Sequence, residues 1–175
     1  MRSPCWTVGS GKAAPDRAGR RKRWTQSWRP CATTGMASAS TAYVDSCIHI
    51  SAVDRRDVWQ VAARSALAGI KDAGILGAVS ALVVMECLVM PFRDGHLERV
   101  RAFDTWFEGF QVLPLDRQVL RLAAELRAST PAVKTPDAIH VACAIHHGCD
   151  EFWTNDDRGL VAAANGRIAI RTLSR

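Results

Sequence analysis

The residues of this chain that could carry chemistry are concentrated in one stretch, KTPDAIHVACAIHHGCDEFWTNDDRG, at residues 134–159. It holds three histidines, two cysteines and five acidic residues. Thiolate and imidazole ligands would favour zinc, whereas carboxylates alone would favour magnesium or manganese. The expected secondary structure helps to separate these two kinds of site.

A helix is expected at residues 136–147, and its geometry separates the histidines. Each residue turns by about 100° from the last, so His146 lies on the side of the helix opposite to His140 and His147. The three side chains cannot converge on one zinc ion without another segment. Cys143 is expected to be a small buried thiol that packs as a hydrophobe. A zinc site is therefore disfavoured.

Two histidines remain candidates for a role in a site. His140 lies one turn from Asp137, so it could contact a phosphate or orient the carboxylate. A structural hydrogen bond is the alternative for His140, and His49 has the same two interpretations.

The elements that must position these residues alternate between short apolar runs and helical patterns from Thr41 onward. This alternation is typical of an α/β domain with a largely parallel sheet. Strands are expected at 41–45, 75–79, 111–115, 151–154 and 168–172. Helices are expected at 54–72, 81–91, 94–108, 117–128 and 136–147. Three residues are expected to cap the helices that follow them: Ser80, Asp116 and Thr135.

The basic residues are concentrated at the start of the chain. The first 35 residues hold eight Lys/Arg and one acid, a charge of +7, whereas the other 140 hold 15 Lys/Arg and 16 acids, a charge of −1. The net charge of +6 is therefore no argument for nucleic-acid binding by the folded body. Residues 1–40 are expected to be disordered or a non-native extension, with Met36 a candidate start. Residues 41–175 are expected to form one domain.

Composition also bears on the compartment. The six cysteines show no regular spacing and no export signal accompanies them, so reduced thiols in a cytoplasmic protein are expected. The apolar run at 73–92 has about the length of a membrane span. It contains two glycines, Ser80 and Glu86 and ends near a proline, which favours a strand, a turn and a helix over a membrane segment.

Four acidic residues are expected to share one cleft. Asp45 ends the first strand and Asp156 follows the strand at 151–154, so both lie beyond the carboxyl ends of parallel strands, where ligands bind in such sheets. Glu86 is flanked by core residues in VVMECLVM, and a buried carboxylate is costly unless it is paired or bound to metal. Asp137 lies in the first turn of its helix.

Clustered carboxylates raise one another's pKa unless cations neutralise them. Hard divalent cations take oxygen ligands and keep several waters, which favours Mg²⁺, with Mn²⁺ as a substitute. Such a metal polarises a phosphodiester and lowers the pKa of a bound water that attacks it. The chemistry expected is hydrolysis of a phosphate ester.

Four segments, in this order, resemble a PIN-domain ribonuclease of the VapC toxin type: YVDSCIHI (43–50), SALVVMECL (80–88), VLPLD (112–116) and TPDAIHVACAIHHGCDEFWTND (135–156). The resemblance covers residues 41–172. It implies a PIN-like three-layer α/β/α fold with a central, mostly parallel sheet.

The resemblance also implies a Mg²⁺-dependent endoribonuclease that acts on structured RNA. Its catalytic and metal-binding acids would be Asp45, Glu86, Asp137 and Asp156. It further implies a homodimer, and inhibition by a small VapB-type antitoxin that occludes the pocket. Other residues are candidates to contact the RNA or to support the metal ligands: Ser46, His140, Thr154, Asn155 and Asp157. Asp157 is also the alternative to Asp156 as the fourth acid.

Two other functions are weighed against this one. A catalytically silent PIN-like module would bind RNA or a partner without cutting it, and the presence of all four acids argues against it. A phosphatase of the haloacid dehalogenase type needs a second aspartate two residues after the first. Cys47 stands at that position, so this alternative is disfavoured.

Overall fold

The described part of the chain is built on five parallel strands. The computed structural model describes residues 39–54, 58–156 and 159–173, so the expectation of disorder in residues 1–40 falls almost wholly outside the described residues. The strands are β1 (Thr41–Val44), β2 (Leu76–Ser80), β3 (Gln111–Leu113), β4 (Glu151–Thr154) and β5 (Ala169–Thr172). They form one sheet in the order β3-β2-β1-β4-β5, and each pairing is parallel. The expected α/β class is confirmed.

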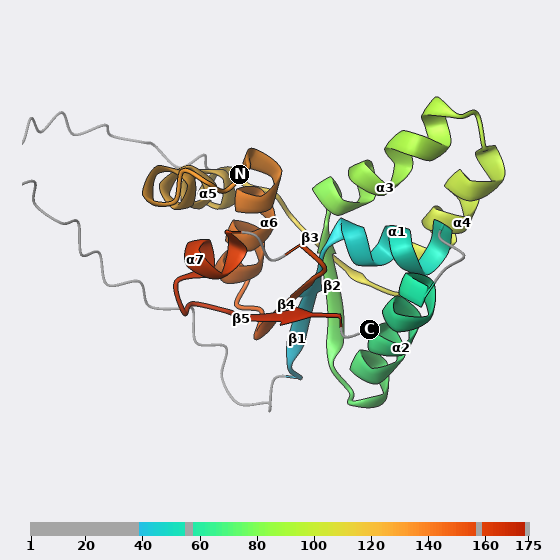
Figure 1. Ribbon diagram of the computed structural model, residues 1–175, viewed down its shortest axis with the longest axis horizontal. Coiled ribbons are helices and arrows are strands. Elements are labelled where there is room, and N and C mark those ends of the chain that lie inside the picture. Colours follow the sequence, from blue (N-terminus) through green and yellow to red (C-terminus); the bar gives the residue numbers. More distant parts are fainter. Residues whose placement is uncertain (1–38, 55–57, 157–158, 174–175) are drawn as a thin grey trace, which may run out of the picture. The chain divides into compact units, whose positions relative to one another are not determined.

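Helices cover both faces of this sheet (Figure 1). They are α1 (Ser46–Asp54), α2 (Val58–Asp72), α3 (Ala81–Arg93), α4 (Leu97–Phe107), α5 (Arg117–Ser129), α6 (Thr135–His146) and α7 (Leu160–Ala164). Figure 1 shows α1 and α2 on one side of the strands and α5, α6 and α7 on the other. Helix α3 packs against both α1 and α4. The result is the expected three-layer α/β/α arrangement.

Two helices are not expected from the sequence. Helix α1 has the sequence SCIHISAVD and buries residues on more than one side: Ile48, His49, Ser51 and Ala52. A helix buried on several sides shows no single apolar stripe, so periodicity does not reveal it. Helix α7 is only five residues long, which is too short for a periodic signal.

Of the three expected caps, only one acts as predicted. Asp116 accepts hydrogen bonds from two first-turn N–H groups of α5. Ser80 lies at the N-cap of α3 but makes no capping hydrogen bond with its side chain. The N-cap of α6 is Lys134, and the predicted cap Thr135 is the first helical residue. The α3 helix also continues through Pro91 to Arg93, two residues beyond the predicted end.

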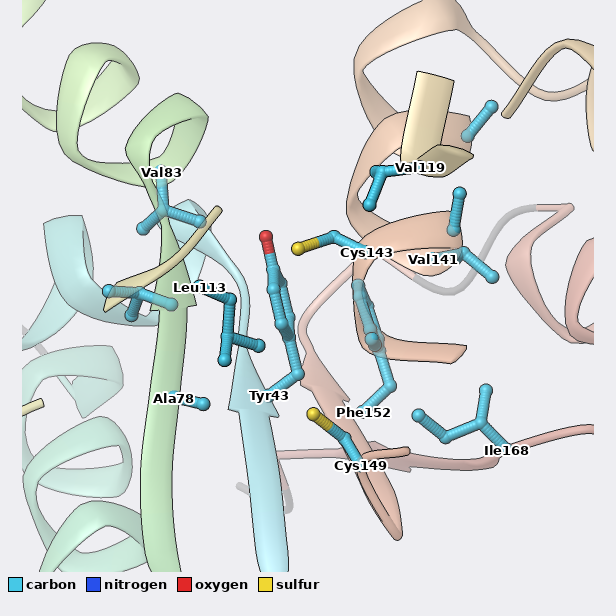
Figure 2. Close-up of a cluster of buried hydrophobic side chains, with 14 of the residues drawn as sticks. Tyr43, Ala78, Val83, Leu113, Val119, Val141, Cys143, Cys149, Phe152 and Ile168 are labelled. Carbon is cyan, nitrogen blue, oxygen red and sulfur yellow. The ribbon is translucent and has the colours of Figure 1, made fainter. Parts of the chain in front are cut away.

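Alternation along β1 sends its side chains to two separate cores. Tyr43 packs on the side of α5, α6 and α7, where its ring stacks on Phe152 with centroids 5.3 Å apart (Figure 2). Ala42 and Val44 pack on the other side, against α1 and α2.

The apolar run at 73–92 was predicted to form a strand, a turn and a helix. In the described part of the chain, no helix combines the length and the hydropathy that a crossing of the bilayer needs.

His49 belongs to the core and not to the candidate site. It is fully buried, and its Nδ1 accepts a hydrogen bond of 3.0 Å from the indole N–H of Trp106. The rings of Phe107 and Phe110 meet it edge-on. Burial disfavours the charged imidazolium and lowers the pKa of His49 to about 3. The structural interpretation of His49 is therefore the correct one.

This burial predicts an acid-sensitive contribution to stability. Unfolded His49 binds a proton below about pH 6.5, whereas the folded protein excludes that proton until about pH 3. The free energy of unfolding should thus fall as the pH drops through this window, by roughly 1.4 kcal/mol per pH unit from this group. His49→Asn keeps an acceptor for Trp106 and does not titrate. Urea unfolding at pH 7 and pH 4.5 should show a smaller loss in the variant, and equal losses would contradict the assignment.

Candidate active site

The order of the strands creates a crevice at one edge of the sheet. From β1 the chain moves outward to β2 and β3, and it then returns to the other side of β1 to form β4 and β5. Connections leaving adjacent strands in opposite directions open a crevice beyond the carboxyl ends of those strands. Asp45 directly follows β1, and Asp156 lies two residues after β4. Both predicted acids therefore follow the pair of strands at which this crevice opens.

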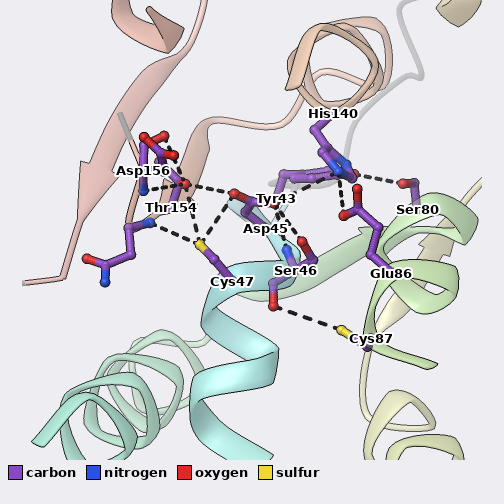
Figure 3. A network of polar contacts seen from close by, with 11 residues as sticks. Tyr43, Asp45, Ser46, Cys47, Ser80, Glu86, Cys87, His140, Thr154 and Asp156 are labelled. Atoms are coloured by element: carbon purple, nitrogen blue, oxygen red, sulfur yellow. Dashed lines mark hydrogen bonds and ion pairs between the residues drawn. The ribbon is translucent and has the colours of Figure 1, made fainter. Parts of the chain in front are cut away.

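Three side chains from three different elements converge beside this crevice (Figure 3). Asp45, Glu86 of α3 and His140 of α6 each offer one ligand atom, and these atoms lie within 4.8 Å of one another. Asp45 and Glu86 were predicted to meet, and they do. The histidine between them was predicted only as a candidate for a supporting contact.

Hydrogen bonds fix the orientation of the Asp45 carboxylate. Its Oδ1 accepts 2.7 Å from the backbone N–H of Ser46, and its Oδ2 accepts 2.7 Å from the hydroxyl of Thr154. Thr154 is fully buried and in turn accepts 3.1 Å from the backbone N–H of Asp156. Asp45 is thus held by the first residue of α1 and by the last residue of β4.

Glu86 is held ionised by its neighbours. Its Oε2 lies 3.0 Å from Nε2 of His140. Burial alone would raise the pKa of Glu86, but hydrogen bonds from His140 and Ser46, together with attraction to His140, bring that pKa below its ordinary value. Ser46, predicted as a supporting residue, therefore acts on both Asp45 and Glu86.

His140 is connected to a tyrosine that sequence reasoning overlooked. Its Nδ1 lies 2.8 Å from the hydroxyl of Tyr43, and this hydroxyl lies 2.8 Å from Oγ of Ser80. The signal that could have revealed Tyr43 is that it is the only tyrosine of the chain and lies in an apolar strand. A buried phenol needs a hydrogen-bonding partner, and such a partner had to lie near Asp45.

Asp137 is not one of the three residues whose ligand atoms converge, but it is near enough to Asp45 for the two charges to interact. It is partly buried in the first turn of α6. Its pKa is raised, first by burial and then by the charges of Asp45 and Asp156, although Lys134 and His140 oppose the rise. Asp137 therefore experiences the repulsion that the clustering of acids predicts.

Asp156, the predicted fourth acid, lies outside the group of ligand atoms that Asp45, Glu86 and His140 form. Asp156 is exposed, and its backbone N–H bonds to Thr154. In Figure 3 it lies beside Thr154, on the opposite side of Asp45 from Glu86. Asp157, the alternative fourth acid, lies outside the described residues. Asn155 donates its backbone N–H to Sγ of Cys47 at 3.2 Å, so its contact here is made by the main chain.

The sulfur near the site lies outside the group of converging ligand atoms, which Asp45, Glu86 and His140 provide. Burial, and then the charge of Asp45, raise the pKa of Cys47 to about 12. Cys143 is fully buried in the core, as predicted. The negative charge of this group therefore comes from its carboxylates.

The other two histidines of the stretch lie elsewhere. His147 contacts the carbonyl of Pro114 at 2.9 Å through Nε2, and His146 lies 3.8 Å from Asp116. Both partners belong to the connection between β3 and α5. The prediction that the three histidines do not converge is confirmed.

The donor set fits a hard divalent cation. Asp45 and Glu86 present charged oxygens side by side, and Asp137 adds a third acid whose pKa is raised first by burial and then by the charges of Asp45 and Asp156. Mg²⁺ and Mn²⁺ prefer such oxygen ligands. A cation bound here would relieve the repulsion that the metal-free arrangement retains.

Comparison of the sequence with protein families gives one assignment. A family model described as PIN domain matches residues 42–165. Comparison with curated proteins gives no match.

Solved structures share the fold at low sequence identity. VapBC2 from Rickettsia felis, bound to a DNA fragment from its promoter, has a TM-score of 0.63 at 12% identity, with 77% of this chain and 99% of that chain covered. A toxin–antitoxin complex from Klebsiella pneumoniae has a TM-score of 0.59 at 22% identity, covering 75% and 96%. VapC20 of Mycobacterium tuberculosis, described as a toxin that cleaves the sarcin–ricin loop, has a TM-score of 0.58 at 16% identity, covering 69% and 94%. At these identities the likeness is one of fold.

The burial of Asp137, together with the charges of Asp45 and Asp156, predicts that removing the charge of Asp137 stabilises the metal-free protein. A carboxyl group whose pKa is raised on folding destabilises the folded state once ionised. In EDTA, Asp137→Asn should therefore raise the free energy of unfolding, by less than about 1 kcal/mol because the charge is partly screened by solvent. The variant should also gain less stability than the wild type from added Mg²⁺.

Asp116→Asn is the matched control. Hydrogen bonds from the N–H groups of α5 lower the pKa of Asp116, so its charge favours folding and its loss should not stabilise the protein. Urea unfolding of both variants, with EDTA and with Mg²⁺, gives the comparison. An Asp137→Asn protein less stable than the wild type in EDTA would contradict the electrostatic account.

Proposed function

This chain belongs to the PIN-domain family, and on that basis we propose that it is a metal-dependent endoribonuclease toxin. It hydrolyses RNA phosphodiester bonds at the site formed by Asp45, Glu86, Asp137 and Asp156. Its cofactor is Mg²⁺, for which Mn²⁺ can substitute. A cognate VapB-type antitoxin neutralises it, and the active form is a homodimer.

The observation that carries this proposal is the convergence of Asp45 and Glu86 at the crevice of the sheet. Their carboxylates, together with His140, come within 4.8 Å of one another although they belong to separate elements. Structural ion pairs normally join opposite charges, whereas two acids held together are favourable when a cation binds between them. Family membership makes a nuclease the class of enzyme that best uses such a site.

The four acids of the site have different proposed roles, and the contacts of each acid support its role. Asp45 and Glu86 are the metal ligands, held in place by Ser46, Thr154 and His140. When bound, a divalent cation polarises a phosphodiester and lowers the pKa of a bound water. Asp137, with its raised pKa, is suited to accept a proton near the metal ligands. Asp156, exposed at the rim, is suited to contact solvent or substrate.

Cleavage of RNA by the purified full-length protein tests the reaction. Structured RNA, such as total tRNA, should be cut with Mg²⁺ and left intact with EDTA. Asp45→Asn should slow cleavage on the order of a thousandfold, because a metal ligand contributes several kcal/mol to the transition state and each 1.4 kcal/mol or so is tenfold in rate. Gel analysis of end-labelled RNA measures the rate.

Asp116→Asn serves as the control, since it makes the same chemical change at an acid that caps α5 outside the site. It should cut at the wild-type rate. Cleavage that persists in EDTA and in Asp45→Asn would refute the metal–carboxylate mechanism. Wild-type protein that binds RNA without cutting it would instead support the silent binding module.

The toxin role predicts growth arrest on expression of the chain in bacteria. VapBC2 from Rickettsia felis and a toxin–antitoxin complex from Klebsiella pneumoniae are among its structural neighbours, which supports an antitoxin as its partner. Expression of the wild type should halt growth, and Asp45→Asn, made to the same level, should relieve the arrest. Arrest by both proteins would point to a toxicity other than RNA cleavage.

A further inference from the structure

A chain of buried polar groups lies behind Glu86. We call Ser80, Tyr43 and His140 the buried relay. Ser80 is fully buried, Tyr43 is fully buried, and His140 is 2% exposed. The contacts run from Ser80 Oγ to the Tyr43 hydroxyl at 2.8 Å, from there to His140 Nδ1 at 2.8 Å, and from His140 Nε2 to Glu86 at 3.0 Å.

In the hydrogen bond between His140 and Glu86, the charge of the carboxylate determines which group is the donor. An ionised carboxylate can only accept hydrogen bonds, so the Nε2–H group of His140 donates the hydrogen bond to Oε2 of Glu86. The Tyr43 hydroxyl has one proton, and it therefore donates to one of its two partners and accepts from the other. Both ring nitrogens of His140 are thus engaged.

We propose that His140 is a positioning residue that holds Glu86 in place as a metal ligand, with Tyr43 and Ser80 fixing its ring. This inference rests on the proposed function and deepens it. The Nε2–H donor takes up one oxygen of Glu86 and leaves the other for a cation. Because Nε2 also lies 3.9 Å from Asp45 Oδ1, the same ring sets the distance between the two carboxylates.

The geometry favours a positioning role over direct ligation. A histidine ligand must present an unprotonated nitrogen to the metal, yet Nε2 is the donor to Glu86 and Nδ1 is satisfied by Tyr43. Histidines and carboxylates that orient metal ligands affect metal affinity by about 10- to 100-fold when removed. His140 has the contacts of such an orienting group.

The cost of the relay argues that it serves more than packing. Burial of polar groups is unfavourable unless each is satisfied, and the polar side chains buried in the described part of the chain are His49, Ser51, Ser80, His140 and Thr154. Three of these five, Ser80, His140 and Thr154, belong to the hydrogen-bond network of Asp45 and Glu86. The relay also joins β1, the end of β2 and α6. Asp45 directly follows β1, α3 with Glu86 directly follows β2, and α6 carries Asp137.

A matched pair of substitutions separates hydrogen bonding from packing. His140→Leu fills the buried site without a donor, and His140→Gln retains an amide N–H that can reach Glu86. Mn²⁺ binding to the full-length protein without RNA, followed by the EPR signal of free Mn²⁺, gives the dissociation constant. His140→Leu should weaken binding by about 10- to 100-fold, and His140→Gln should restore most of it.

Two further variants complete the test. Tyr43→Phe removes only the hydroxyl behind the ring, and it should weaken Mn²⁺ binding less than His140→Leu does. His147→Leu changes a histidine of the same helix that contacts Pro114, and its affinity should equal that of the wild type. If His140→Leu does not fold, Tyr43→Phe still decides. Wild-type affinity in Tyr43→Phe, and in His140→Leu where that variant folds, would overturn the proposal.

Electron spin echo measurements on bound Mn²⁺ distinguish a positioning residue from a ligand. The wild type should show no directly coordinated nitrogen, and a nitrogen coupling that disappears in His140→Gln would make His140 a ligand and overturn the proposal. Mn²⁺ binding without RNA cleavage would refute the proposed function alone. A wild type that binds no Mn²⁺ would refute this inference. If that protein still cuts RNA in EDTA, it is a nuclease whose activity does not depend on a metal ion.

Discussion

Repulsion between carboxylates is the constraint around which this structure is organised. Two like charges a few ångströms apart in a partly buried crevice are unfavourable unless donors or cations offset them. The chain supplies donors from several directions: a backbone N–H and a threonine hydroxyl for Asp45, and a histidine for Glu86. The pKa of Asp137 stays raised, first by burial and then by the charges of Asp45 and Asp156, although Lys134 and His140 oppose the rise. The remaining unfavourable charge is what a metal ion would neutralise.

The topology explains how residues so far apart in sequence reach one crevice. A parallel sheet brings the carboxyl ends of all its strands to the same edge. Since β1 lies between β2 and β4, Asp45 stands at the centre of that edge. Helix α3, which carries Glu86, starts directly after β2, while α6, on the other side of the sheet from α1 and α2, carries Asp137 and His140. Each face of the sheet therefore contributes one side of the site.

The sequence alone predicted the position of an acidic residue where that position depends on the residues next to it in the chain. Strand ends placed Asp45 and Asp156, and an acid inside an apolar helical run identified Glu86. Local pattern failed for α1, whose buried residues lie on more than one side, and for Ser80, whose hydroxyl contacts Tyr43 in place of a helix N–H. The partner of Tyr43 is His140, 97 residues away. Such a pairing depends on how α6 packs on β1, and no short-range spacing encodes it.

The histidine-rich stretch that suggested zinc is better understood as three separate hydrogen-bonding tasks. His146 and His147 meet the connection between β3 and α5, whereas His140 is directed toward Glu86. Helical rotation separates these side chains, and tertiary packing then gives each a different partner. The thiol of Cys47 is partly buried, and its pKa is raised to about 12. The two carboxylates of the group therefore provide the charged oxygens that hard cations prefer, although imidazoles and thiols surround them in the sequence.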